Sequence, residues 1–212
     1  MRAELRTLGT VSAQVVARHL VMAGRLIDVD PEQAWQHAAA AARRAGRIGA
    51  VREAAGLTAY AAGRFAEAQR ELRAAMRLSG TVDQLPLLAD CERGLGRPQR
   101  ALTLASSADL ARLDHAGRIE MRIVAAGARR DMGQLDAALA TLQGPELEGH
   151  GPPEALARLW YAYADTLAEM GRTGEALEWF ERVAGIDTEG ETDAEERIDA
   201  LRAARRPRPA DG

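Results

Sequence analysis

Apolar residues recur along this chain three and four positions apart, the spacing that places them on one face of an α-helix. Val16 and Leu20 follow this spacing near the start of the chain, and Trp160, Tyr163 and Leu167 follow it near the end. Between such stretches the polar residues fall on the opposite side of the helix. The pattern therefore predicts a series of amphipathic helices, each with one buried face.

A short phrase follows these helical stretches and pairs a glycine with an alanine five positions later. Glycine can end a helix in the left-handed conformation, and a small alanine lets the next helix approach to about 8–10 Å. Each phrase therefore predicts a helical hairpin, and the alanines lie 33 to 38 positions apart, a spacing typical of hairpin repeats. The copies are GRFAEA (63–68), GRPQRA (96–101), GQLDAA (133–138) and GRTGEA (171–176), with a fifth, VDPEQA (29–34), in which Asp30 and Pro31 start the second helix instead.

Hairpins of this kind cover one another's apolar faces when they stack in series. We expect about five of them over residues 15–190, after a lead-in at 1–14. Ile198 and Leu201 give residues 191–203 an amphipathic pattern, which predicts a helix that caps the last hairpin. The proline-containing segment 204–212 has no apolar anchor and is predicted to be a flexible tail.

Composition favours the all-α class and argues against nucleic-acid binding. Hydrophobic residues make up 47% of the chain and charged residues 28%, enough for a packed core, whereas aromatic residues make up only 4%. The formal net charge is −3, so no strong positive field attracts a phosphate backbone. All 28 basic residues are arginine, and neither lysine nor asparagine occurs.

The amino terminus and the single cysteine indicate the cellular compartment in which the protein is expected. Cys91 is the only cysteine, so no disulfide can form within the chain, and a reducing compartment is the simplest expectation. Charged residues interrupt the first ten positions, and no run approaches the roughly 18 apolar residues of a membrane span. We therefore predict a soluble cytoplasmic protein without a membrane partner, with Cys91 as a small buried hydrophobe.

Candidate catalytic and metal-binding motifs have simpler explanations. The four histidines do not show the spacing of a zinc site, and Gly94 and Gly96 follow a helix where a phosphate loop would follow a strand. Asp165 and Glu169 share a helix face, but charged side chains on a solvated face are far more common than an acid/base pair. The sequence predicts no enzyme activity, no cofactor and no metal.

At this level of detail the chain resembles the tetratricopeptide repeat family, whose repeat reads W-x2-L-G-x2-Y and then A-x3-F-x2-A. The resemblance covers about residues 15–188, and the overall impression is similar to small repeat proteins of high-GC bacteria. A second good copy lies around Tyr60 and Phe65. The carboxyl-terminal copy matches best, with Trp160, Tyr163, Ala164, Leu167, Ala176, Phe180 and Val183 in register.

The resemblance implies a right-handed superhelical solenoid whose concave surface, lined by the first helix of each hairpin, binds a peptide or partner protein. It implies a scaffold or adaptor. Repeat proteins that grip chaperone carboxyl termini use asparagine with lysine or arginine, so this chain is not expected in that subclass. The inner surface is expected to include His19 and Glu120, together with the peptide-binding candidates Glu53, Tyr60, Asp90, Arg93, Arg130, Arg158, Tyr161 and Asp165.

Three alternatives remain open at this stage. The chain could be a regulatory subunit of an enzyme complex, or it could associate with itself through the ends of the stack. The aromatic residues Trp35, Trp160, Trp179 and Phe180 could also form a hydrophobic binding patch. The repeat motif places Trp160 and Phe180 in the core and leaves Trp179 partly exposed on the second helix of its hairpin.

Overall fold

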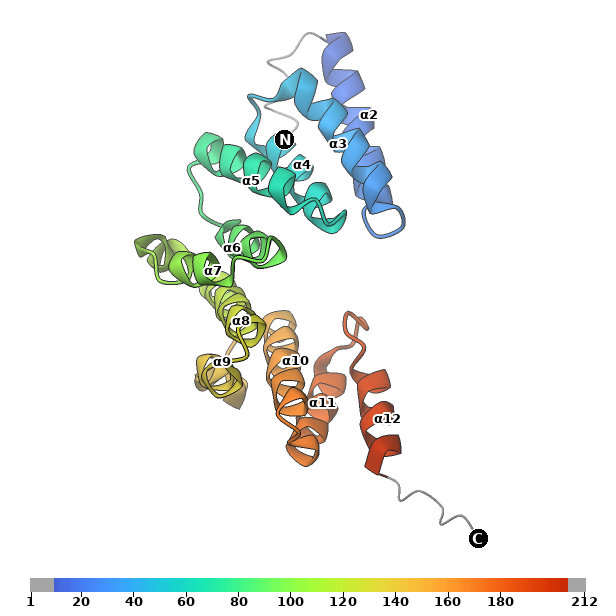
Figure 1. Cartoon of the computed structure of the whole chain (residues 1–212). Coiled ribbons are helices and arrows are strands. Elements are labelled where there is room, and N and C mark those ends of the chain that lie inside the picture. The colour runs from blue at the N-terminus through green and yellow to red at the C-terminus, as the bar shows by residue number, and fades with distance from the viewer. Residues whose placement is uncertain (1–9, 206–212) are drawn as a thin grey trace. The chain divides into compact units, whose positions relative to one another are not determined.

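The computed structural model describes residues 10–205, and its regular structure is entirely helical (Figure 1). The predicted all-α class is confirmed. The chain divides into two compact units, the first ending at Arg112 and the second beginning at Leu113, and each is treated by itself below. None of the helices within the described range is long and apolar enough to cross a bilayer.

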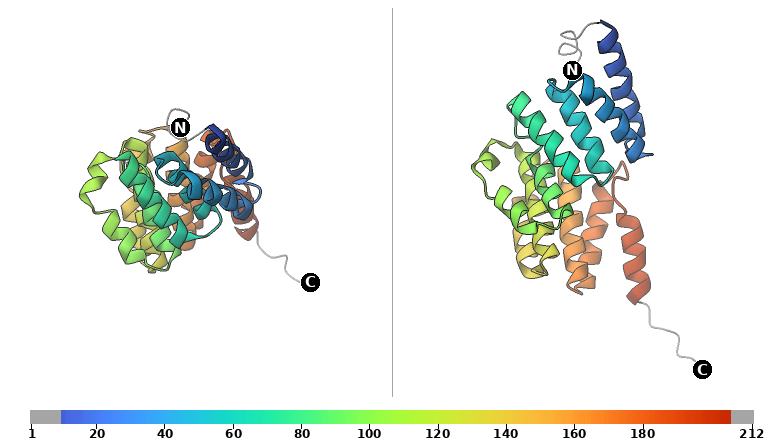
Figure 2. Two further views of the ribbon diagram at one scale, coloured as in Figure 1. Left: turned by 90° about the horizontal axis from the view of Figure 1, so that it is seen from above. Right: turned by 45° about the horizontal axis from the view of Figure 1, so that its top comes forward.

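The first unit contains three successive helical hairpins. The helices α2 to α5 lie side by side, each packed on the next (Figures 1 and 2). The third hairpin has a short second helix, and a 3₁₀ segment η1 follows it. The elements are α2 (Thr10–Leu26), α3 (Pro31–Ala45), α4 (Gly49–Ala61), α5 (Phe65–Ser79), α6 (Leu85–Gly94), α7 (Pro98–Leu104) and η1 (Ala108–Arg112).

The second unit contains two hairpins and a final helix. A 3₁₀ segment, η2, lies in the connection between the two hairpins, where the sequence contains Gly144-Pro145 and Gly151-Pro152-Pro153. The helices α10, α11 and α12 run side by side (Figures 1 and 2). The elements are α8 (His115–Asp131), α9 (Leu135–Leu142), η2 (Pro145–Glu148), α10 (Pro153–Glu169), α11 (Thr173–Ile186) and α12 (Ala194–Arg205).

The turns within the hairpins form as predicted. The four turn glycines adopt positive φ angles between 69° and 75°, a region that a Cβ atom disfavours. In the first hairpin Asp30 starts α3 instead, because its carboxylate accepts a hydrogen bond from the backbone N–H of Gln33 at 2.9 Å. The glycines are Gly63, Gly96, Gly133 and Gly171.

Gly171 and Gly174 offer a matched test of the turn in the last hairpin. Gly171 has φ +75° and Gly174 lies in the first turn of α11 without a positive φ, and a Cβ at either position would meet no atom within 4 Å. We expect Gly171→Ala to lower the free energy of unfolding of the second unit by about 1 kcal/mol, through backbone strain alone. Gly174→Ala is expected to raise it by up to about 1 kcal/mol. Urea unfolding of both variants measures the difference, and two shifts of the same sign would contradict this account.

The repeated alanines lie where two helices cross. Their side chains are completely buried, as expected for residues at closely packed helices: Ala34, Ala68, Ala101, Ala138 and Ala176 are all 0% exposed. In the first unit, Val16, Ala38, Val51 and other buried residues of α2, α3 and α4 form one hydrophobic cluster.

The core of the second unit continues into the last helix. Leu167, Phe180 and Val183 are fully buried and share one cluster with Ile198 of α12, which is 7% exposed. Leu201 packs against the same cluster. Helix α12 thereby covers apolar surface of α11 that would otherwise face water.

Some details differ from the sequence-based expectations. Trp160 is only half-buried, and its indole N–H donates to the carbonyl oxygen of Glu146 at 3.0 Å. Phe180 is buried and Trp179 is partly exposed, as expected. Helix α2 begins at Thr10, inside the expected lead-in, of which residues 1–9 lie outside the described range. Most of the expected tail, residues 206–212, also lies outside it.

Candidate functional site

The predicted inner-surface residues all lie on the first helices of the hairpins. Because the two units are treated separately, these residues form two sets. In the first unit they are His19 on α2, Glu53 and Tyr60 on α4, and Asp90 and Arg93 on α6. In the second unit they are Glu120 and Arg130 on α8, and Arg158, Tyr161 and Asp165 on α10.

Tyr60 joins α4 to α6 in the first unit. Its hydroxyl donates a short hydrogen bond to the carboxylate of Asp90, and Arg93 pairs with the other oxygen of that carboxylate at 2.7 Å. Burial, together with this hydrogen bond, raises the pKa of Tyr60 well above its ordinary value. The phenol therefore stays protonated at neutral pH and acts as a donor that holds the two helices in register.

The other two predicted residues of the first unit are also paired. The carboxylate of Glu53 accepts a hydrogen bond from the side-chain amide of Gln84 at 2.6 Å. The Nδ1 atoms of His19 and His37 lie 3.0 Å apart, with the ring centroids at 5.2 Å. Burial and then the neighbouring His37 lower the pKa of His19, which favours its neutral form.

Arg130 and Asp165 form the centre of an ion-pair network in the second unit. Arg130 on α8 contacts Asp165 and Glu169 of α10, both at 2.7 Å. Asp165 also accepts from Arg197 of α12 at 2.5 Å, so one carboxylate connects α8, α10 and α12. The side chains of Arg130, Asp165 and Arg197 keep 27%, 21% and 33% of their surface exposed.

The remaining predicted residues lie along the same helices. Arg158 of α10 pairs with Glu120 of α8 at 2.7 Å and reaches Glu191 at 3.6 Å. The hydroxyl of Tyr161 donates to Asp193, just before α12, at 2.5 Å. Burial and this hydrogen bond raise the pKa of Tyr161 to about 12. These nine side chains lie on α8, α10 and α12 or just before α12, and we call them the polar row: Glu120, Arg130, Arg158, Tyr161, Asp165, Glu169, Glu191, Asp193 and Arg197.

Sequence reasoning named both members of some of these contacts, such as Arg130 and Asp165, but missed Arg197 and Asp193, the partners of Asp165 and Tyr161. Arg197 and Asp193 each lie 32 positions after their partners in α10, one repeat further along the chain. That spacing is visible in the sequence, because charged or aromatic residues recur at equivalent places in successive first helices. The acidic pair Asp165 and Glu169 serves as the counter-charge of Arg130 rather than as an isolated pair of carboxylates.

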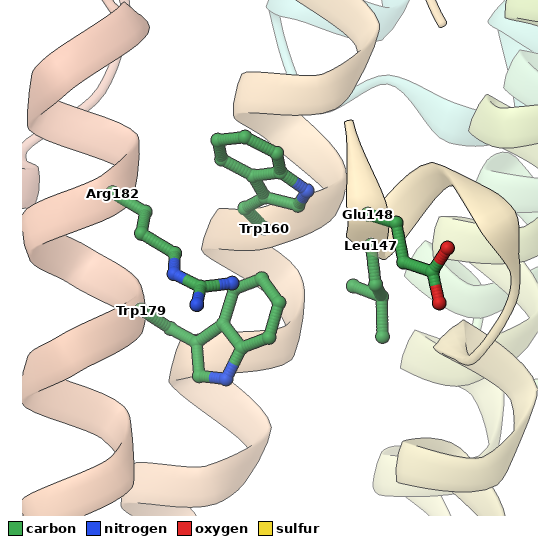
Figure 3. Close-up of a pocket in the computed structure, with 5 residues that line it drawn as sticks. All are labelled: Leu147, Glu148, Trp160, Trp179 and Arg182. Carbon is green, nitrogen blue, oxygen red and sulfur yellow. The ribbon is translucent and has the colours of Figure 1, made fainter. Parts of the chain in front are cut away.

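An aromatic pocket lies on another part of the second unit (Figure 3). Its volume is about 560 Å³. The Trp179 ring meets the rings of Trp160 and Tyr163 edge to face, with centroids 6.1 and 4.9 Å away, and the Arg182 guanidinium stacks over it at 4.4 Å. The lining residues are Leu147, Glu148, Trp160, Trp179 and Arg182.

The histidine, cysteine and acidic side chains do not form a metal centre within residues 10–205. No cluster of three or more histidine, cysteine, aspartate or glutamate side chains there is placed to hold a metal ion. Cys91 is fully buried, as predicted, and burial together with Asp90 and Glu92 raises the pKa of its thiol to about 12. A thiol of this kind is a poor nucleophile at neutral pH.

Comparison with known proteins agrees with the repeat pattern in one segment. Residues 157–189, which cover most of α10 and all of α11, match the model of the tetratricopeptide repeat. The segment contains Trp160, Tyr163, Ala176 and Phe180, on which the resemblance in the sequence rested. No curated protein matches this chain.

Two solved structures are similar to this chain at low sequence identity. The crystal structure of yeast Tom70 is 15% identical with a TM-score of 0.45, and the match covers 89% of this chain and 46% of that one. The structure of Naa15/Naa10 bound to HypK-THB is 13% identical with a TM-score of 0.32, covering 88% of this chain and 39% of that one. This chain therefore spans less than half the length of either.

Proposed function

We propose that this chain is a protein-interaction module that holds a peptide or partner protein against the first helices of its hairpins. Tetratricopeptide repeats are stacked hairpins that present extended surfaces to protein partners. The matched repeat at residues 157–189 includes α11 and most of α10, the helix that carries three of the predicted binding residues. The proposal concerns binding and includes no chemical step.

The polar row of the second unit is the observation that carries this proposal. Its arginines and tyrosine are held by partners on neighbouring helices, yet they remain partly exposed. A side chain that is already fixed loses little conformational entropy when a ligand binds. Arginine and tyrosine are also enriched among the residues that dominate protein interfaces. The row carries both signs of charge and offers donors and acceptors suited to a peptide backbone.

The aromatic pocket is the second candidate location for the same function. Trp160 and Trp179 are partly exposed there, and tryptophan is a frequent interface anchor. A partner that inserts an apolar side chain between Leu147 and the two indoles would bind independently of the polar row. The two locations can be separated by mutation, since they use different side chains.

The test is affinity capture from a lysate of the source organism, with three variants compared to the original chain. Arg158→Glu with Tyr161→Ala alters the polar row, Trp179→Ala alters the aromatic pocket, and Glu178→Ala changes an exposed residue of α11 as the control. We expect the polar-row variant to reduce recovery of one partner by at least about tenfold, as loss of an interface hot spot does. Circular dichroism first establishes that helicity is unchanged.

Other outcomes assign the binding elsewhere. Loss with Trp179→Ala and retention with the polar-row variant would place the partner in the aromatic pocket. Equal recovery with all variants would contradict both locations. If no partner is recovered and the mass in light scattering rises with protein concentration, the chain associates with itself, the alternative that the repeat stack also allows. An enzyme in the recovered complex would favour the regulatory-subunit alternative.

A further inference from the structure

A second pocket lies in the first unit, between α3, α4 and α5. Its volume is about 400 Å³, within the usual range for small-ligand sites. We call it the arginine pocket. It is lined by Trp35, Ala39, Ala42, Arg43, Arg52, Ala55, Arg70 and Glu71. It uses residues of two second helices, α3 and α5, and it shares no residue with the predicted binding set on the first helices.

The charge of this pocket is strongly positive. Three guanidinium groups line it, and Glu71 is the single carboxylate among the lining residues. Glu71 is 11% exposed and contacts Arg52 at 2.6 Å and Arg70 at 3.4 Å. The one carboxylate neutralises only one of the three guanidinium charges, which leaves an excess of two positive charges. Arg43 is exposed and Arg70 keeps 67% of its side-chain surface exposed, so both can reach a ligand from solvent.

Arg52 is fixed at the base of the pocket. Its Nε donates to the carbonyl oxygen of Gly46 at 2.8 Å while its Nη1 contacts Glu71. A Cβ at position 46 would lie only 2.7 Å from Nη2 of Arg52 and 2.7 Å from the backbone carbonyl oxygen of Ala42. Glycine at this position therefore allows the guanidinium to lie flat against the end of α3. A guanidinium held in this way is oriented before any ligand arrives.

Small side chains and one aromatic ring complete the pocket. Ala39, Ala42 and Ala55 leave open space that larger residues on packed helices would fill. Trp35 adds an apolar wall, and its ring is held by Arg64, whose guanidinium lies 4.1 Å from the ring centroid. Arg64 is itself fixed by two hydrogen bonds to Glu32, at 2.8 and 2.7 Å. The pocket thus combines a rigid flat surface with excess positive charge.

We propose that the arginine pocket binds a phosphate monoester carried on a flat apolar group. A phosphate monoester carries about −1.5 to −2 charges at neutral pH, which matches the excess of two positive charges. Guanidinium groups pair with phosphate oxygens through two parallel hydrogen bonds. The apolar group would lie against Trp35. Such a phosphorylated flat group can belong to a free small molecule or to a phosphorylated tyrosine side chain of a protein.

The test is calorimetric titration of the full chain with phenyl phosphate, inorganic phosphate, benzoate and a short tyrosine-phosphorylated peptide. We expect saturable binding of phenyl phosphate, tighter than that of inorganic phosphate because of Trp35, and weaker binding of the singly charged benzoate. Arg43→Ala and Arg70→Ala are each expected to weaken phenyl phosphate binding by roughly tenfold, the effect of losing one charge-assisted hydrogen bond. Arg77→Ala, an exposed residue of the same helix α5 outside the pocket, is the matched control and should change binding by less than about twofold.

Two further variants separate this site from general attraction to positive charge. Trp35→Ala should remove the preference for phenyl phosphate over inorganic phosphate, and Gly46→Ala should weaken both by displacing Arg52. Comparable affinity for phenyl phosphate and the peptide would indicate a free small molecule, and tighter binding of the peptide would indicate a phosphorylated protein. Absence of saturable binding by every phosphate probe, or an equal loss with Arg77→Ala, would overturn the proposal.

Discussion

Replacing Phe180 with alanine is expected to lower the free energy of unfolding of the second unit by about 3–5 kcal/mol, the usual cost of removing a buried phenyl ring. Phe180 is 0% exposed and belongs to the cluster that joins α10, α11 and α12. The ring of Tyr161 meets it edge to face with centroids 5.3 Å apart, and the Arg197 guanidinium lies 5.1 Å from its centroid. The substitution therefore removes contacts to two neighbouring helices at once.

The measurement is urea unfolding followed by tryptophan fluorescence in a Trp35→Phe background. Trp160 and Trp179 then report the second unit alone, because both lie in it. Glu178→Ala, an exposed change two positions away in the same helix, is the control and should shift the free energy of unfolding by less than about 0.5 kcal/mol. A Phe180→Ala loss no larger than that of the control would mean that α12 and α10 do not depend on this ring.

The hairpins could be predicted from the sequence because their determinants are local. A glycine that must turn in the left-handed region and an alanine that must fit at a helix crossing act within six residues of each other. The recurring Gly171 and Ala176, for example, mark the last turn and the last crossing directly. The same reasoning identified the start of α3 from Asp30 and Pro31.

The partners of the predicted binding residues could not be predicted in the same way. Whether Asp165 meets Arg130, Arg197 or solvent depends on the register between helices that are more than 30 positions apart in the chain. The periodicity of a single helix contains no information on that register. The residues were therefore predicted as an open polar groove, whereas in the structure they pair with one another or with other side chains nearby.

The two pockets escaped prediction for a related reason. Leu147 and Glu148 reach the tryptophans because residues 145–148 form a 3₁₀ segment, where the sequence showed only an interruption rich in glycine and proline. In the arginine pocket, alanines indicated close helix packing, although three of them line open space beside Trp35. Such spaces depend on the arrangement of three helices, which no local pattern determines.

Alkaline pH is expected to destabilise the first unit through Cys91. Burial, with Asp90 and Glu92 nearby, raises the pKa of its thiol from an ordinary value near 9 to about 12. Above pH 9 the unfolded chain releases this proton while the folded chain retains it, so stability falls as the pH rises towards 12 and is fully present below pH 9. The slope approaches about 1.4 kcal/mol per pH unit well above pH 9, and the loss between pH 9 and pH 11 is about 2 kcal/mol. Tyr60, whose pKa is also raised, adds to the loss at the upper end of this range.

Cys91→Ala provides the decisive comparison. In a background with Trp160→Phe and Trp179→Phe, Trp35 reports the first unit, and urea unfolding at pH 8, 9, 10 and 11 gives the pH dependence of each variant. The original chain should lose more stability than Cys91→Ala as the pH rises, because alanine has no proton to release. Equal slopes would show that the thiol titrates alike in both states, which is incompatible with its burial beside two carboxylates. Slow alkylation of the folded protein at pH 8, with rapid alkylation in urea, is the matching chemical result, since only an accessible thiolate reacts.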